Sequence, residues 1–114
     1  MARLTDKELL ALFREALSEW RADGYVVWKK LPVEWLRKEL EGQTQKSIAQ
    51  LMHEHVEAGG EIDQVRERRE RYRDQCEFHF DFRLKFNGRR VYIETTLDNT
   101  STGPTITIVN MHDE

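Results

Sequence analysis

The sequence predicts a single α+β domain over 1–114, in which three N-terminal helices pack on one face of an antiparallel sheet of at least three strands. Three observations predict this fold. The 114 residues suffice for one ordinary core and are too few for two. Apolar residues recur at helical spacing up to about residue 60, and beyond it they alternate with polar residues as in strands. Because the helices come first, we expect a helical part over about 1–60 and a sheet part over about 61–114.

The first helix is expected to begin at Thr5. Thr5 and Glu8 have the spacing of a capping box, in which each side chain bonds the backbone N–H of the other residue. The apolar residues that follow share one helical stripe, namely Leu9, Leu10, Phe13, Ala16, Leu17 and Trp20. Gly24 is a natural stop just beyond the end of this helix.

Two further helices are expected over 32–40 and 44–57. Pro32 suits the first turn of a helix, and Gly42 ends the earlier of the two. The later helix is predicted to bury one face, made of Ile48, Leu51, Met52, His55 and Val56. The short β-prone run over 25–28 is either a strand or a buried loop.

The strongest signal in the sequence is the pair of runs on either side of Asn87-Gly88. In 77–86 apolar and polar residues alternate perfectly, with Phe78, Phe80, Phe82, Leu84 and Phe86 on one face. Asn-Gly favours a two-residue type I′ turn, because both positions need a positive φ. Such a loop fixes the register with 90–97, so that Phe82 lies opposite Ile93 and both apolar sets share one face.

A third strand is expected over 105–111, after a loop over 98–103. Ile106 and Ile108 suit the core face of this strand, and beyond Ile108 apolar residues fall on both faces, as expected of a more enclosed strand or of one with a bulge. Strict alternation would then turn Asn110 and His112 towards the core as well, unless a β-bulge intervenes. We therefore expect His112 at the rim of the sheet, where it is either functional or merely exposed.

The same register defines a polar face, which we expect to be open to solvent and which is the candidate catalytic site. Asp81 falls opposite Glu94 and Arg83 opposite Tyr92, with His79 two residues before Asp81 on the same face. Two carboxylates side by side on a sheet repel by about 0.2–1 kcal/mol, so a compensating cation is expected. Carboxylates beside His and Arg are typical of sites in which pKa values are pushed apart for acid–base catalysis. The alternative interpretation is an exposed sheet face with mixed charges.

Charge is unevenly distributed along the chain. The net charge is −3 and the pI about 5.8, which excludes the strongly basic face of a dedicated nucleic-acid-binding domain. Only the segment over 66–73 is locally basic. Contacts with phosphate or RNA are therefore expected to begin at Arg66, Arg68 and Arg69.

Several classes of protein and site are excluded by composition. No apolar run approaches the roughly 18–20 residues of a membrane span and no signal peptide is evident, so we expect a cytoplasmic protein with no membrane partner. The single Cys76 cannot form an internal disulfide. His53 and His55 are two apart on a helix and cannot bind one ion from one face. We expect no metal and no cofactor, and we expect His55 to be a satisfied core or interface histidine.

The C-terminal sheet resembles that of RelE-like toxin ribonucleases and of the wider barnase, EndoU and colicin-type nuclease group. The resemblance rests on the hairpin 82–97, the strand 105–109 and His112, about a third of the chain. In that group helices precede an antiparallel sheet, and side chains on its exposed face activate an RNA 2′-hydroxyl without a metal. Carried over to this sequence, the resemblance implies a general base, a phosphate clamp and a base-stacking or proton-donating group. The general base would be Glu94 or His79, and the phosphate clamp would be Arg83 or Arg90. Tyr92 would be the base-stacking or proton-donating group.

The least specific function is the one that the sequence favours, a protein-interaction or assembly domain. Tyr25, Trp28, Trp35 and the segment 66–73 would form its interface with a protein partner or a second copy, because aromatic residues and Arg are enriched at binding hot spots. The first alternative is a metal-independent ribonuclease that uses the polar face of the 77–97 hairpin.

The second alternative is a winged helix-turn-helix domain, in which the helix over 44–57 would enter the major groove of DNA. That helix carries only Lys46 as a fixed positive charge, against Glu54 and Glu57. Repulsion from phosphate therefore argues against a DNA partner.

Overall fold

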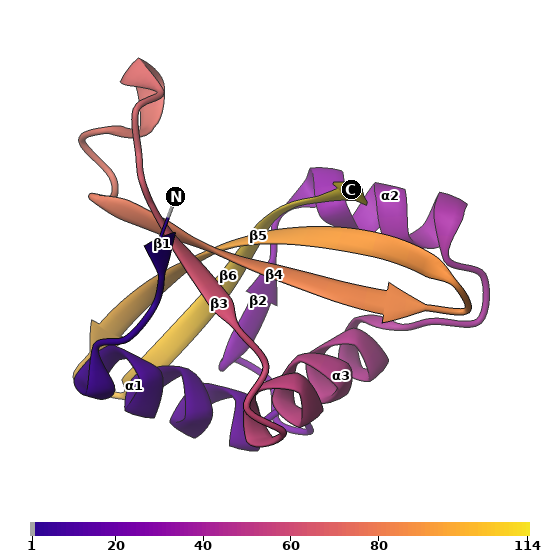
Figure 1. Cartoon of the computed structure of the whole chain (residues 1–114), viewed down its shortest axis with the longest axis horizontal. Helices are drawn as coiled ribbons and strands as arrows, with labels where there is room; N and C mark the ends of the chain where they lie inside the picture. The colour runs from indigo at the N-terminus through magenta and orange to yellow at the C-terminus, as the bar shows by residue number, and fades with distance from the viewer. Residues whose placement is uncertain (1) are drawn as a thin grey trace.

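The computed structural model describes residues 2–114, which form three α-helices and one six-stranded sheet (Figure 1). The helices are α1 (Lys7–Ser18), α2 (Lys30–Glu39) and α3 (Gln45–Glu57). The strands are β1 (Ala2–Arg3), β2 (Val26–Trp28), β3 (Ile62–Arg66), β4 (Phe78–Phe86), β5 (Arg89–Thr100) and β6 (Gly103–Asp113). A 3-10 helix, Glu70–Tyr72, lies between β3 and β4. The predicted α+β class is confirmed.

The sheet contains more strands than the sequence identified. Its order is β1-β3-β4-β5-β6-β2, with β2 parallel to β6 and every other neighbouring pair antiparallel. The strand reading of 25–28 is confirmed by β2. The edge strand β1 and the inner strand β3 were not predicted, because β1 has only two residues and β3 lacks regular alternation of apolar side chains.

The helices begin close to the predicted positions, but α1 has a different cap. The Asp6 side chain, not Thr5, accepts hydrogen bonds from the backbone N–H groups of Glu8 and Leu9, at 2.9 and 3.0 Å. The capping box predicted for Thr5 is therefore wrong, because an adjacent carboxylate takes its place. Thr44 caps α3 in a box with Ser47, and α2 begins at Lys30, two residues before Pro32.

The hairpin of β4 and β5 has the predicted turn and register. Asn87 and Gly88 have φ angles of 48° and 79°, as a type I′ turn requires. Phe82 pairs with Ile93 and Asp81 with Glu94. The register of β4 with β5 extends from the turn back to Phe80. The first two residues of β4, Phe78 and His79, pair with Arg66 and Val65 of β3.

Strands β5 and β6 form a longer hairpin than expected. The segment 98–103, predicted as a loop, is mostly strand, with Thr100 paired to Gly103. The predicted bulge is confirmed, because Glu94 pairs with Asn110 and the next residue of β5 pairs with Ile108. Val109 is thus the extra residue on β6. It allows Ile108 and Met111 both to be buried while the side chains of the last residues turn to the other face.

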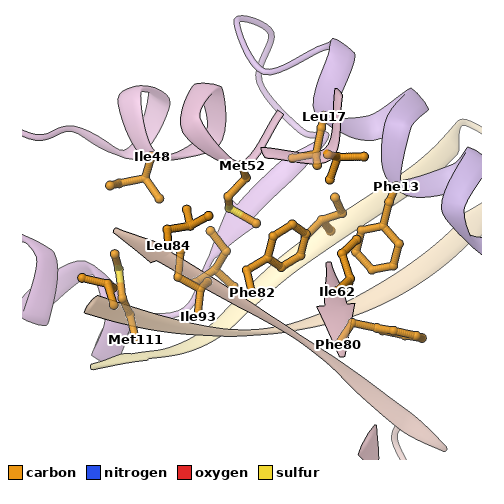
Figure 2. Packing of buried hydrophobic residues seen from close by; sticks show 14 of the residues in the cluster. Phe13, Leu17, Ile48, Met52, Ile62, Phe80, Phe82, Leu84, Ile93 and Met111 are labelled. Atoms are coloured by element: carbon orange, nitrogen blue, oxygen red, sulfur yellow. The ribbon is translucent and has the colours of Figure 1, made fainter. Parts of the chain in front are cut away.

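The core lies between the helices and the phenylalanine face of the sheet. Figure 2 shows Phe13 and Leu17 of α1 and Met52 of α3 packed over Phe82. The Phe13 ring lies 5.9 Å from that of Phe82. Leu36 and Leu40, within and at the end of α2, belong to the same buried cluster. In the described part of the chain, no helix is long and apolar enough to cross a membrane.

Candidate functional site

The polar face is on the side of the sheet away from this core, and the predicted acids lie in its middle. A row of four side chains crosses the sheet on this face, namely Asp63, Asp81, Glu94 and Asn110. The expectation that this face is open is wrong at the row's centre, where Asp81 is 2% and Glu94 5% exposed. Two buried carboxylates on adjacent strands need cationic or hydrogen-bonding partners.

Arg69 supplies the cation for Glu94. Its guanidinium contacts the Glu94 carboxylate and also donates to both oxygens of Glu67, at 2.9 and 2.8 Å. These bonds hold the pKa of Glu67 at about 2, even though burial opposes the shift. The same carboxylates raise the pKa of Arg69 above its usual value. Arg69 was predicted to bind phosphate, but its charge is neutralised within the protein.

Arg69 reaches the sheet from the segment 67–77, which connects β3 to β4 and stands away from the helices (Figure 1). Of the other arginines predicted to bind phosphate, Arg66 contacts Glu77 at 3.5 Å and Arg68 is exposed. A pocket of about 450 Å³ lies under this segment, with Glu67, Arg69 and Glu94 in its lining. The alternation of apolar and polar residues in the sequence did not indicate that the segment 67–77 covers Glu94.

His79 and Asp81 form a buried pair. His79 Nδ1 lies 2.9 Å from Asp81 Oδ1, and the two side chains are 12% and 2% exposed. The pKa of Tyr92 is raised well above its usual value, mainly by burial and then by hydrogen bonding to the Asp81 carboxylate. The Tyr92 hydroxyl therefore stays protonated and acts as a donor. A chain of contacts thus runs from His79 through Asp81 to Tyr92.

A second row on the polar face contains Arg83, Tyr92 and His112, which are paired across β4, β5 and β6. The Tyr92 and His112 rings are stacked, with centroids 4.6 Å apart, and the Arg83 guanidinium lies 5.5 Å from the Tyr92 centroid. Tyr92 is therefore flanked on both sides. His112 is exposed, as expected at the rim. The sequence predicted this position of His112 but did not indicate that its ring stacks on Tyr92.

The hydrogen bond of His112 defines its tautomer. His112 Nδ1 lies 2.7 Å from the backbone carbonyl oxygen of Asp113, which can only accept. Nδ1 therefore carries the proton in the neutral ring, and Nε2 holds the lone pair. An exposed imidazole of this kind can take a proton from a ligand.

Two arginines beside this stack converge on one carboxylate. Arg83 Nε lies 2.8 Å from one carboxylate oxygen of Glu114, and Arg90 Nη2 lies 3.1 Å from the other. Arg83 also contacts Asp63. We call Arg83 and Arg90 the arginine clamp. Both arginines that the resemblance offered as a phosphate clamp belong to it, whereas Arg66, Arg68 and Arg69 do not.

His55, Trp28 and Trp35 have structural surroundings. His55 Nε2 lies 2.7 Å from the carbonyl oxygen of Glu61, so it is a satisfied histidine, although half-buried rather than in the core. Trp28 and Trp35 are partly buried against the core cluster, which leaves less of them for an interface than the sequence suggested. Within residues 2–114, no group of three or more His, Cys, Asp and Glu side chains is arranged to hold a metal ion.

Comparison with models of known protein families, with curated proteins and with solved structures finds no significant match to this chain. The function is therefore argued from the site itself. Asp81 and Glu94, which are buried, and His79, which is nearly so, support the accessible part of the site. That part consists of His112 and Arg90, which are exposed, and of Arg83 and the Tyr92 ring, which are half-buried.

Proposed function

We propose that this protein is a metal-independent ribonuclease whose reactive groups are the arginine clamp and His112. The observation that carries the proposal is the convergence of Arg83 and Arg90 on one carboxylate beside an exposed imidazole. Guanidinium groups suit phosphate because they match its geometry and keep their charge. An imidazole with a free Nε2 is the commonest general base near neutral pH.

In the proposed reaction a phosphodiester binds to Arg83 and Arg90, and the adjacent ribose lies over His112. Nε2 of His112 takes the proton of the RNA 2′-hydroxyl, and the 2′-oxygen forms a bond to phosphorus. The bond from phosphorus to the 5′-oxygen breaks, and that oxygen takes a proton from solvent. The products are a 2′,3′-cyclic phosphate and a 5′-hydroxyl. The clamp stabilises the extra negative charge of the pentacovalent phosphorane.

The buried residues act as positioning groups in this proposal. Asp81 holds the Tyr92 hydroxyl and is itself bonded to His79, so the Tyr92 ring is fixed beside His112. Because Tyr92 has neighbours on both faces, an RNA base would stack on the outer face of the His112 ring. Glu94 is bound to Arg69, and this pairing favours a structural role over that of a base.

The test is cleavage of a labelled single-stranded RNA by the purified protein in EDTA, with analysis of the product ends. We expect 2′,3′-cyclic phosphate ends, and no cleavage at a position that carries a 2′-deoxyribose. His112→Ala should reduce cleavage by at least a hundredfold, the contribution typical of a general base. Arg83→Gln and Arg90→Gln should each reduce it by about tenfold or more.

Matched controls are available in the same chain. His53→Ala removes a histidine on α3, and Arg37→Gln removes an exposed arginine on α2. Both variants should cleave RNA at the wild-type rate. Full activity of His112→Ala with an unchanged fold would exclude His112 as the base, and absence of cleavage by the wild type would exclude the proposal.

A second candidate function, self-association, is favoured by the surface at β2. Leu31 and Val27 are 69% and 36% exposed, and β2 lies at the edge of the sheet. An exposed strand edge beside apolar side chains can pair with a second copy. Light scattering at several concentrations tests this function: a mass that doubles with concentration, and that stays monomeric in Leu31→Lys, would support it.

A further inference from the structure

Glu114 occupies the position in which the proposed reaction places a phosphate. Its two side-chain oxygens each accept from one arginine of the clamp, so that the carboxylate bridges Arg83 and Arg90. Its backbone N–H donates to the Arg90 carbonyl oxygen at 3.0 Å, which fixes the residue beside the clamp. The Glu114 side chain is 29% exposed, so the two arginines shield the carboxylate only in part from solvent.

We propose that the arginine clamp is an oxyanion site for a phosphate group and that the Glu114 carboxylate is its internal competitor. A phosphodiester and a carboxylate both offer two oxygens to guanidinium groups, and both cannot occupy the clamp together. The inference rests on the proposed function only for the identity of the anion as an RNA phosphate. Binding of phosphate itself requires no cleavage.

The charges around the clamp agree with a ligand that carries negative charge. Asp63 and Glu114 both contact Arg83, and Glu114 also contacts Arg90. Lys85 is paired with Arg90 on the same face and is exposed. When Glu114 leaves, this group of side chains loses one negative charge, and the positive charges of Arg83, Arg90 and Lys85 favour an incoming anion.

Glu114 can leave at a small cost. Arg90 is 69% exposed, and ion pairs with such exposed partners contribute little to stability. The neighbouring Asp113 is held differently, because it accepts from Arg89 Nε and Nη2 at 2.6 and 2.8 Å, and Arg89 is anchored to Glu39 of α2. The chain can thus remain attached at Asp113 while the Glu114 side chain swings away.

The experiment is a titration of the full chain with inorganic phosphate, followed by the NMR signals of the Arg83 and Arg90 Nε–H groups. Glu114→Gln keeps the length of the side chain and removes its charge. We expect this variant to bind phosphate about three- to tenfold more tightly than the wild type, as expected for the loss of two partly exposed ion pairs. A non-cleavable 2′-deoxy oligonucleotide should gain affinity by a similar factor.

Glu34→Gln is the matched control, because it makes the same change in net charge at an exposed residue of α2 and leaves the clamp and its neighbours in place. Its affinity for phosphate should be unchanged. Equal gains in phosphate affinity for the two variants would show that only the net charge matters and would overturn the proposal. The absence of phosphate-induced shifts of the Arg83 and Arg90 Nε–H signals would overturn it as well. Tighter phosphate binding by Glu114→Gln without any RNA cleavage would uphold the inference and reject the proposed ribonuclease.

Discussion

Tyr92 on β5 stacks against His112 on β6, with ring centroids 4.6 Å apart and ring planes inclined by 25°. The stack depends on the bulge at Val109, because without the extra residue His112 would lie on the core face of β6. The bulge in the pairing of β5 with β6 thus places an imidazole on the same face of the sheet as the arginine clamp.

The Tyr92 ring and the Tyr92 hydroxyl should make separable contributions. Tyr92→Phe keeps the ring and loses the bond through which Asp81 positions it, so we expect a loss of about 1 kcal/mol in unfolding free energy and a reduction of RNA cleavage smaller than that of Tyr92→Ala. Tyr92→Ala removes the neighbour of His112 and should reduce cleavage by tenfold or more. Chemical denaturation and cleavage rates of both variants check this prediction. Equal cleavage by the two variants would mean that the stack has no part in the reaction.

The pair of Glu67 and Arg69 should make stability depend on acid. The bonds from Arg69 lower the folded-state pKa of Glu67 to about 2, below its ordinary value of 4.5. Their contribution to unfolding free energy is therefore complete above about pH 4.5 and is lost as the pH falls towards 2. In Glu67→Gln this contribution to the unfolding free energy, on the order of 2 kcal/mol, should be missing at pH 7. The unfolding free energy of the variant should also fall less steeply with decreasing pH than that of the wild type.

Urea denaturation of the wild type and Glu67→Gln from pH 2 to pH 7 measures this difference. Glu70→Gln is a suitable control, because Glu70 is an exposed residue of the same segment. Parallel curves for all three proteins would show that the Glu67–Arg69 contact does not contribute to stability.

The identity of the cap of α1 can be tested by two single substitutions. Asp6→Ala removes the acceptor for two backbone N–H groups and should lower the unfolding free energy by about 1 kcal/mol. Thr5→Ala should change it by less than about 0.5 kcal/mol, as for an exposed residue outside a cap. Thermal denaturation of both variants distinguishes the two caps, and the reverse order of effects would restore Thr5 as the capping residue.

Gly60 should be intolerant of a side chain because of His55. A Cβ atom at Gly60 would lie 2.4 Å from Cε1 and Nδ1 of the His55 ring, so the ring would have to move and lose its contact with Glu61. We expect Gly60→Ala to cost about 1–3 kcal/mol. In a His55→Ala background the same change should cost clearly less, and a double-mutant cycle by urea denaturation measures this coupling. Additive effects would contradict it.

The sequence by itself determined the α+β class, the β4–β5 hairpin and the neighbouring positions of Asp81 and Glu94. The alternation of 77–86 and the Asn87-Gly88 turn are local signals, and a two-residue loop leaves only one register. The need for a bulge in β6 also followed from the sequence, because buried residues on that strand do not keep one alternation.

Only the tertiary structure decided which polar residues are buried and which are exposed. Alternation identifies a face of a sheet, but it does not reveal that Arg69 comes from the segment 67–77 to cover Glu94. Nor does it show that Glu114 bridges Arg83 and Arg90. These contacts join residues that are far apart in the chain, and their geometry depends on how the strands pair and on how the segment 67–77 lies on the sheet.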